Sequence, residues 1–526
     1  MRDGAHPREM AAGRLIPAGL LMALAALWAA APAVRADVRL PEVFSDHLVL
    51  QQGVPVSVWG WAAPGEEVTV SFAGQNIATH AGADGRWMVR LQPLKPGGPA
   101  AEMTVTGRNT LRVRDVLVGE VWVCAGQSNM ELSLSQATGG EQEAARAADT
   151  QIRFFEYLIK KASAEPLPNV RGRWVVCTPE TAARFSAVAY YFGRDLRQAT
   201  GRPVGLIPAT MGGSLAEAWI SPVAFQGDKQ LAAARTRYEK DIQSYLATLR
   251  KAVADWEEAA AQARAKGQPV PPAPPPVPDP QTLPGAPSSL YNGLVAPIIP
   301  LAIAGVAWYQ GESNVPDSEA YRHVLTALIG DWRRAWGQGD FPFLVVQLPN
   351  HQARGTLPEM SLWAELRESQ ARAMALPRTA LVVTIDLGDA VDIHPKNKQD
   401  VGRRLALAAR AVAYGEKIVY SGPVYDSMTV EGGAVRLRFT HIGGGLESRG
   451  ATLFGFVVAG EDKKFVSADA KIEGDTVVVS SRDVAKPVAV RYAWADNPAC
   501  NLYNKDGLPA PPFRTDDWPL LSREHR

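Results

Sequence analysis

Apolar runs alternate with amphipathic stretches through the middle of the chain. The stretches between the runs have helical periodicity, for example at 184–200 and 320–336. Strand–helix alternation of this kind is typical of an α/β layered domain with a mostly parallel sheet. We assign residues 118–414 to this domain. Its apolar runs lie at 118–125, 203–209, 303–310, 341–348 and 380–387.

Short segments in which apolar and polar residues alternate flank the α/β domain on both sides. Segments such as 56–61 precede it, separated by glycine-bearing turns, and predict an N-terminal β-sandwich domain over 37–117. Segments such as 435–439 follow it and predict a C-terminal β domain over 415–526.

The first 36 residues have the pattern of a secretory signal peptide. They have a basic start, an apolar stretch at 15–33 and small residues before Asp37. A membrane anchor is the alternative, but the apolar stretch is short for a span and holds two prolines. We therefore expect a periplasmic or secreted protein with no stable membrane anchor after cleavage.

An insertion at about 225–288 interrupts the α/β pattern. Residues 228–266 carry apolar side chains at helical spacing among charged ones and predict an amphipathic helix or a helical hairpin. Residues 269–287 are proline-rich and predict an extended linker. Packing on the domain surface is the favoured interpretation of the insertion. A substrate lid and a dimer arm are the alternatives, and the oligomeric state stays open.

Charge and cysteine content exclude several classes of protein. The formal net charge is +1, so no strong field draws the chain to nucleic acid or to an anionic membrane. No paired-cysteine or His-Glu-x-x-His spacing occurs, so neither a metal site nor a cofactor is predicted. The cysteines, Cys124, Cys177 and Cys500, are odd in number, so at least one stays free or pairs between chains. Cys124 lies in an apolar run and is expected to be a core residue.

Each apolar run of the α/β domain ends in a polar turn. Because the carboxyl ends of parallel strands meet at one edge of a sheet, we expect these turns to form one site there. The turns are Gly126-Gln127-Ser128-Asn129, Met211-Gly212-Gly213-Ser214, Gly311-Glu312-Ser313-Asn314, Pro349-Asn350-His351 and the segment from Asp386 to Asp392-Ile393-His394.

The first turn has the pattern of a nucleophile-presenting turn. A buried strand ends in glycine, a hydroxyl residue follows, and a helix-permissive run comes next, which leaves Ser128 exposed at the strand end. The alternative is a structural loop in which Ser128 caps the helix. Among the histidines, His394 is the favoured base because Asp392 and Asp389 stand beside it. His351 is the weaker candidate because no acid is near it in sequence.

Stabilising an oxyanion needs N–H donors aimed at the developing charge. The backbone N–H groups of Ser128 and Gly213 and the side-chain amide of Asn314 are the candidates. Gln127 and Gln310 are further amides that are candidates for binding substrate.

The order Ser…Gly…Asn…His on successive loops is similar to the SGNH (GDSL-like) hydrolases. The chain resembles the sialate O-acetylesterase family more closely, over nearly its whole length from LPEVFSDHLVLQQG. The motifs that carry this resemblance are GEVWVCAGQSNME, GGSLAEAW, LYNGLVAPIIP, WYQGESN, DIHPKNKQDVGRRLA and RYAWADNPACNLYNKDGLPAPPF.

The resemblance implies an SGNH-type (flavodoxin-like) α/β core with flanking β domains. It also implies hydrolysis of O-acetyl esters on carbohydrates without a metal. Carried over to this chain, it makes Ser128 the nucleophile, His394 the base, and Gly213 and Asn314 oxyanion residues.

The acid that orients His394 is the point at which the chain departs from the SGNH pattern. The usual acid stands three residues before the histidine, and Val391 occupies that position. Asp392, two residues before, is the expected acid. Glu312 is the alternative, because the resemblance extends to acetyl esterases of plant polysaccharides that use the glutamate of this motif.

The expected reaction is a two-step acyl transfer that removes acetyl groups from a carbohydrate, with O-acetylated sialic acid as the first candidate. An esterase of acetylated xylan or pectin is one alternative, and a non-catalytic glycan-binding protein on the same scaffold is another. A glycosidase with paired carboxylates is the third, and it does not explain why Ser128 and Asn314 share the rim.

Overall fold

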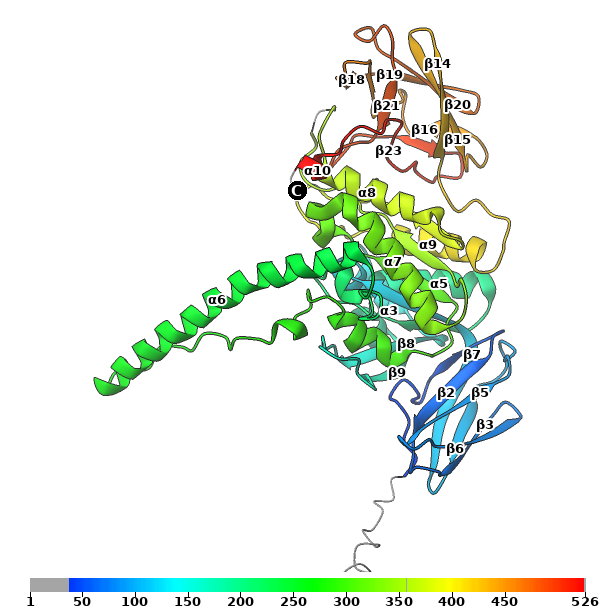
Figure 1. Cartoon of the computed structure of the whole chain (residues 1–526). Coiled ribbons are helices and arrows are strands. Elements are labelled where there is room, and N and C mark those ends of the chain that lie inside the picture. The colour runs from blue at the N-terminus through cyan, green and yellow to red at the C-terminus, as the bar shows by residue number, and fades with distance from the viewer. Residues whose placement is uncertain (1–36, 356, 525–526) are drawn as a thin grey trace, which may run out of the picture.

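The computed structural model describes residues 37–355 and 357–524. The segment expected to be a signal peptide lies outside these residues. Figure 1 shows a β domain, an α/β domain and a second β domain following one another, with one long helix extending away from the middle part. Within the described ranges, no helix has both the length and the apolar character needed to cross a bilayer.

The central sheet has the strand order β13-β12-β11-β7-β10-β8-β9. All neighbours in this order are parallel except β9, which is antiparallel to β8. The predicted class, an α/β domain with a mostly parallel sheet between flanking β domains, is therefore confirmed. The strands are β7 (Thr110–Gly126), β8 (Asp149–Ile159), β9 (Arg171–Cys177), β10 (Val204–Ile207), β11 (Gly305–Tyr309), β12 (Phe343–Val346) and β13 (Thr379–Val382).

Two strands of this sheet, β8 and β9, do not appear among the predicted runs. Their sequences, DTQIRFFEYLI and RGRWVVC, mix charged with apolar residues, and only part of each is buried. Strand β9 is at the edge of the sheet, where a strand is partly open to water and lacks the continuous apolar pattern of the central strands. Strand β8 lies between β10 and β9 and is buried only over residues 152–155, too short a run to stand out in the sequence.

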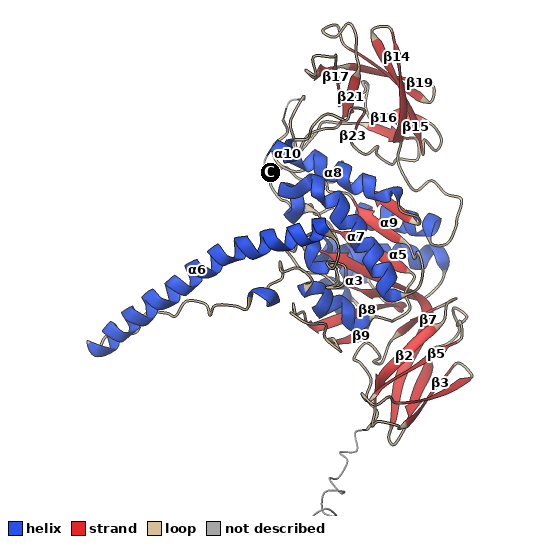
Figure 2. Ribbon diagram, in the orientation of Figure 1, coloured by secondary structure: helices blue, strands red, loops and turns tan. Residues whose placement is uncertain are grey.

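Helices cover both faces of the sheet (Figure 2). Val121 and Val123 of β7 share a core cluster with residues of α7, whereas Trp122 and Cys124 share another with residues of α5 and α9. This is the alternation expected of a strand buried on both faces, and it confirms Cys124 as a core residue. The helices are α2 (Ser128–Glu131), α3 (Gly140–Arg146), α4 (Pro179–Arg184), α5 (Ala187–Thr200), α6 (Lys229–Ala265), α7 (Ser318–Trp336), α8 (Leu362–Arg372), α9 (Lys398–Val412) and α10 (Leu521–Glu524).

Strand β7 belongs to two parts of the molecule. Its first half pairs with β6 of the N-terminal domain and its second half with β10 and β11 of the central sheet. One continuous strand therefore links the N-terminal domain to the turn that carries Ser128. The other strands of the N-terminal domain are β1 (Val49–Gln51), β2 (Val56–Trp61), β3 (Glu67–Phe72), β4 (Gln75–His80), β5 (Arg86–Leu91) and β6 (Ala101–Thr106).

The C-terminal β domain packs on the α/β domain through a buried arginine. The Arg367 guanidinium of α8 is fully buried and donates to the carbonyls of Leu348 and Pro349 and, across the boundary, to those of Ala495 and Asp496. The strands of this domain are β14 (Val424–Glu431), β15 (Ala434–Thr440), β16 (Leu446–Ser448), β17 (Phe456–Ala459), β18 (Val466–Ser467), β19 (Asp469–Glu473), β20 (Thr476–Ser480), β21 (Ala489–Tyr492), β22 (Leu502–Asn504) and β23 (Phe513–Arg514).

The insertion forms an arm that projects from the α/β domain (Figure 1), so the favoured interpretation, packing on the domain surface, is wrong for most of its length. It contains one continuous 37-residue helix, α6, so the amphipathic helix is confirmed and the helical hairpin is wrong. The proline-rich segment has almost no regular secondary structure and returns along α6. The Tyr238 hydroxyl donates to the Pro280 carbonyl (2.7 Å), and the Trp256 indole donates to the Pro271 carbonyl (2.8 Å).

Candidate active site

Ser128 stands at the carboxyl end of the central strand β7. Gly126 has φ +140°, and a Cβ there would collide with the carbonyl oxygen of Tyr309 in β11, so only glycine allows the two strands to approach. The chain then turns and Ser128 begins α2, half-buried. In the sheet, β7 lies between β10 and β11, where the strand order changes direction, which is the usual place for a ligand.

The His394 imidazole meets the Ser128 hydroxyl. Its Nε2 lies 2.8 Å from Oγ, across 266 positions of the chain. Carboxylates hold the histidine loop in shape: Asp389 accepts hydrogen bonds from the backbone N–H groups of Val391 (2.8 Å) and Asp392 (3.0 Å). Asp392 in turn accepts one from the backbone N–H of His394 (2.8 Å). The structure thus brings together the predicted serine and the favoured histidine.

His351, the weaker candidate base, lies elsewhere on the rim. Its Nδ1 is 3.1 Å from the Asp389 carbonyl oxygen, and its ring packs on Trp363 at a centroid distance of 5.5 Å. In the structure it is part of the support for the histidine loop.

Asp392 is the carboxylate beside the second imidazole nitrogen. Its Oδ1 lies 3.4 Å from His394 Nδ1, an ion-pair contact longer than an ordinary hydrogen bond. The carboxylate is 43% exposed. The backbone N–H of His394, together with the Lys396 ammonium 3.2 Å away, keeps the pKa of Asp392 below its usual range. Asp392 is therefore ionised at neutral pH.

Glu312, the alternative acid, lies beneath the serine turn. Its Oε1 accepts a 2.5 Å hydrogen bond from the Asn129 side chain, and no partner for its Oε2 exists among the described residues. Burial raises the pKa of this carboxyl. Asn129 also donates to the Ile393 carbonyl (3.0 Å), next to His394. Glu312 thus acts on the histidine loop through Asn129, and no direct bond joins it to the imidazole.

A buried lysine, Lys398, completes this network and was not predicted from the sequence. Its ammonium donates to the Asn129 side-chain oxygen (2.5 Å) from the first turn of α9. Burial lowers the pKa of Lys398 to about 7, and the charge of Glu312 opposes this shift. Asn129 is held from both sides, so the turn that carries Ser128 has a single orientation.

The predicted oxyanion loop after β10 lies against Ser128. A Cβ on Gly212 would lie 3.6 Å from the Cβ of Ser128. Gly213 is exposed, has φ +68°, and has open space where a side chain would stand. The N–H of Ser128 is in the first turn of α2, where backbone donors have no partner within the helix. These two N–H groups remain candidates for binding an oxyanion.

A salt bridge that the sequence did not predict braces the same loop. The Lys160 ammonium donates to Glu131 (2.5 Å) and to the Thr210 hydroxyl (2.8 Å). The second oxygen of Glu131 accepts the backbone N–H of Gly212 (2.9 Å). The brace therefore sets the position of the loop that carries Gly213.

Two of the predicted site residues are scaffold residues in the structure. The Asn314 side chain is 2% exposed; it donates to Glu217 (2.9 Å), and its oxygen accepts bonds from Ala216 and Gln310. Gln310 is fully buried and bonds to the Ser214 carbonyl, to Asn314 and to the Tyr321 hydroxyl. In the structure both amides serve these internal bonds, and the assignments of Asn314 to the oxyanion and of Gln310 to substrate stay predictions.

Gln127, the other amide assigned to substrate, is also buried, at 3% exposure. Its side-chain oxygen accepts the backbone N–H of Gly311 (3.3 Å). This contact ties the serine turn to the loop after β11.

Two cavities are lined by residues that precede or follow the loop after β10 in the chain. One of about 420 Å³ includes Glu131, Lys160 and Thr210 in its wall. Another of about 260 Å³ is lined by Leu215 and Ser313 and by Tyr238 of α6.

The C-terminal domain supports the histidine loop. Asn497 accepts a 2.8 Å hydrogen bond from Asn350, whose oxygen accepts the N–H of Gly388 (2.7 Å). The Tyr503 hydroxyl donates to Asp386 (3.1 Å), and Arg404 holds the same carboxylate with two bonds of 2.7 Å. The loop between β13 and α9 is therefore anchored at Asp386 and Gly388, ahead of His394.

A serine hydroxyl bonded to an imidazole at the carboxyl end of a parallel sheet defines the class of serine hydrolases. Comparisons with known proteins identify the family. Residues 286–411 match the family model of a carbohydrate esterase, sialic acid-specific acetylesterase. The chain is 30% identical over 521 residues to the sialate O-acetylesterase of Rattus norvegicus, covering 90% of this chain and 94% of that protein.

The sialate O-acetylesterase of Mus musculus is 31% identical over 520 residues, with the same coverage. Among solved structures, a carbohydrate acetylesterase from Xanthomonas citri superposes with a TM-score of 0.78 at 41% identity, covering 91% of this chain and 100% of that one. The chain belongs to the sialate O-acetylesterase family, and it is a carboxylic ester hydrolase.

Proposed function

We propose that this enzyme removes O-acetyl groups from carbohydrates, with O-acetylated sialic acid as the first candidate substrate. The observation that carries the proposal is the 2.8 Å contact between His394 Nε2 and Ser128 Oγ in a chain of this family. The family match and the acetylesterase relatives support a carbohydrate ester as the substrate.

In the first step, His394 Nε2 takes the Ser128 proton while Oγ bonds to the acetyl carbonyl carbon. The N–H groups of Ser128 and Gly213 bind the negative oxygen that forms. The imidazolium then gives its proton to the sugar oxygen as the bond between that oxygen and the acyl carbon breaks. The sugar leaves and an acetyl group remains on Ser128.

In the second step, His394 takes a proton from a water molecule that attacks the acetyl-serine. The imidazolium returns this proton to Oγ, and acetate leaves. Asp392 stabilises the imidazolium in both steps, because it is ionised and lies 3.4 Å from Nδ1. The cycle needs no cofactor to balance its atoms or electrons.

The Ser128→Ala variant tests the chemistry. We expect acetate release from p-nitrophenyl acetate to fall to background, with circular dichroism and melting temperature like those of the wild type. A matched variant, Ser135→Ala, removes an exposed hydroxyl seven positions further on and should keep full activity. More than a few per cent of wild-type activity in Ser128→Ala would refute the nucleophile assignment.

A comparison of natural esters tests the substrate. We expect the wild type to release acetate faster, as kcat/KM, from O-acetylated sialic acid than from acetylated xylan. Faster release from xylan would move the proposal to plant polysaccharides and leave the chemistry intact. Release from neither, with p-nitrophenyl acetate hydrolysed, would refute the carbohydrate substrate.

We further propose that the enzyme acts in the periplasm or outside the cell. The basis is the sequence pattern of residues 1–36. Cell fractionation and N-terminal sequencing test it: the mature chain is expected in the exported fraction and is expected to begin at Asp37. A chain that begins at Met1 in the cytoplasmic fraction would refute this proposal.

A further inference from the structure

Two tryptophans stand on the outer face of the N-terminal domain, far from Ser128. In β2, Val56, Val58 and Gly60 face the domain core, so Trp59 and Trp61 face outward and are only half-buried. The antiparallel partner β5 places Met88 directly opposite Trp59 and Arg86 directly opposite Trp61. Two indoles, a thioether and a guanidinium therefore share one outward face, where polar residues are the rule for a solvent-facing strand.

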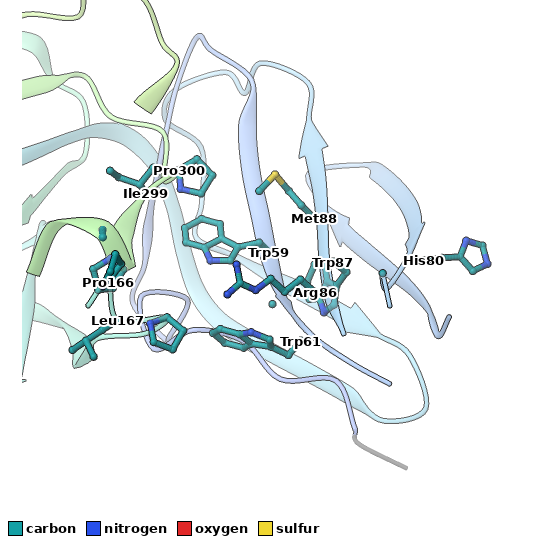
Figure 3. A pocket seen from close by; sticks show the side chains of 15 residues that line it. Trp59, Trp61, His80, Arg86, Trp87, Met88, Pro166, Leu167, Ile299 and Pro300 are labelled. Carbon is teal, nitrogen blue, oxygen red and sulfur yellow. The ribbon is translucent and has the colours of Figure 1, made fainter. Parts of the chain in front are cut away.

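This face forms one wall of a cavity of about 580 Å³. Segments of the α/β domain form the opposite wall: Pro166, Leu167 and Pro168 after β8, and Ile299 and Pro300 before β11. Figure 3 shows the Arg86 side chain extending between the indoles of Trp59 and Trp61 toward this wall. The volume is within the usual range of small-molecule sites, and an apolar, aromatic lining with a few polar groups is typical of them.

The aromatic walls are held in place before any ligand arrives. Trp59 packs edge-on against Phe44 at a centroid distance of 4.6 Å, and the Arg39 guanidinium lies 5.9 Å from the centre of the Trp61 ring. A rigid aromatic surface loses little conformational freedom on binding. Met88 is 41% exposed, so the face is open to solvent at its edge.

The cavity is separate from the catalytic centre. Strand β11 runs from Gly305, paired with Trp122, to Tyr309, paired with Gly126 at the serine turn. Ile299 and Pro300 precede β11 and so lie toward the amino end of the sheet, whereas Ser128 is at the carboxyl end. A ligand in this cavity makes no contact with the reacting atoms.

We propose that this cavity is a second carbohydrate-binding site that takes a sugar ring of the substrate polymer or glycoprotein. Indole faces offer flat apolar surfaces to the C–H face of a pyranose, and the Arg86 guanidinium supplies donors for its hydroxyls. The choice of a carbohydrate as the ligand rests on the proposed function. The site holds an acetylated glycan on the enzyme while its esters are hydrolysed one after another.

Binding is tested in the Ser128→Ala background, where no ester is consumed. The probes are acetylated xylan and a mucin that carries O-acetylated sialic acids, each cast in a native gel. We expect at least one polymer to retard the Ser128→Ala protein and the Trp59→Ala/Trp61→Ala change to abolish most of that retardation. Trp256→Ala, which removes a tryptophan from the distant arm, is the matched control and should migrate like the parent.

Kinetics give a second readout. With the wild-type serine present, Trp59→Ala/Trp61→Ala should leave kcat/KM for p-nitrophenyl acetate within about twofold, while KM for the bound polymer rises at least fivefold. Met88→Glu, at an exposed position of the same face, should also raise KM for the polymer. Because this substitution is at the surface, it tests the site even if the double variant misfolds.

The outcomes separate this inference from the proposed function. Retardation that is the same in the tryptophan variants, or absent for both polymers, overturns the inference, whatever the esterase assays show. Retardation that depends on Trp59 and Trp61 upholds the site even if wild-type enzyme releases no acetate from either polymer.

Discussion

The carboxylate of Asp392 lies 3.4 Å from Nδ1 of His394, whereas that of Glu312 bonds to Asn129. The two carboxylates also differ in environment. Asp392 is 43% exposed and ionised, while Glu312 is buried and burial raises its pKa. An exposed acid with a long contact to the imidazole is a loose orienting group, so we assign Glu312 a positioning role that supports it through Asn129.

The first prediction separates these roles. Asp392→Asn keeps an oxygen for the backbone N–H of His394 and removes only the charge, so kcat should fall, by up to about 10⁴-fold, with the fold intact. Glu312→Gln keeps an acceptor for Asn129 and should lower kcat by less than about tenfold. Kinetics with p-nitrophenyl acetate and melting temperatures measure both effects. The opposite order of losses would make Glu312 the acid.

The second prediction concerns the buried Lys398. Its pKa is lowered to about 7 by burial, against 10.5 for an ordinary lysine. Between these values the unfolded chain binds more protons than the folded one, so this group makes the free energy of unfolding rise with pH over that window. The slope from one group is at most about 1.4 kcal/mol per pH unit.

Urea unfolding of the wild type and of Lys398→Met at pH 7, 8 and 9 measures this contribution. The difference in free energy of unfolding, wild type minus variant, should increase with pH. Lys396→Met is the matched control, because Lys396 is exposed on the same loop, and it should show no such trend. A difference that is flat or falls with pH contradicts the expected burial of the Lys398 charge.

The third prediction tests the oxyanion loop with two glycines that have the same φ angle. Gly213 and Gly201 both have φ +68° and open space around Cα, but Gly201 ends α5 at the other end of β10. Alanine at either position should cost about 1 kcal/mol of stability from strain alone. Only Gly213→Ala should also lower kcat, by about 10-fold or more, because a methyl group enters the space left for the acyl oxygen. Equal kcat values in the two variants would remove Gly213 from the oxyanion site.

The sequence predicted the part of the site that depends on strand order. Gly126 before Ser128, and the polar turns after the other apolar runs, are local patterns, and the parallel sheet places them on one edge. His394 followed by elimination among few histidines. These inferences need no knowledge of how a given side chain points.

Side-chain direction within a loop is what the sequence could not supply. Asn314 stands two residues after Glu312 in the turn η6 (Glu312–Asp317), and the first turns of this 3-10 helix point its amide inward to Glu217. Lys398 was missed because its partner Asn129 is 269 positions away. The alternating pattern of the strand accounts for Trp59 and Trp61 as ordinary strand residues. The cavity beside them forms because segments of the α/β domain lie opposite, and the sequence does not show this.

The fourth prediction concerns the arm. Tyr238 bonds to Pro280, so the two limbs of the arm are adjacent near its root, and residues 243–275 can be replaced by a short Gly-Ser linker. Leu231 and Ala234, the buried residues of the first turns of α6, remain. We expect kcat/KM for p-nitrophenyl acetate within about twofold of the wild type, because the contacts around Ser128 come from other elements.

A substitution at the start of α6, where the arm joins the α/β domain, serves as the comparison for this deletion. Leu231→Ala removes a fully buried side chain and should cost about 2–5 kcal/mol of stability while the arm stays complete. Melting temperatures and p-nitrophenyl acetate kinetics measure both variants. A loss of more than tenfold in kcat/KM on removing residues 243–275 would show that the outer arm affects the catalytic site. We expect no such loss, because α6 extends away from the α/β domain (Figure 1).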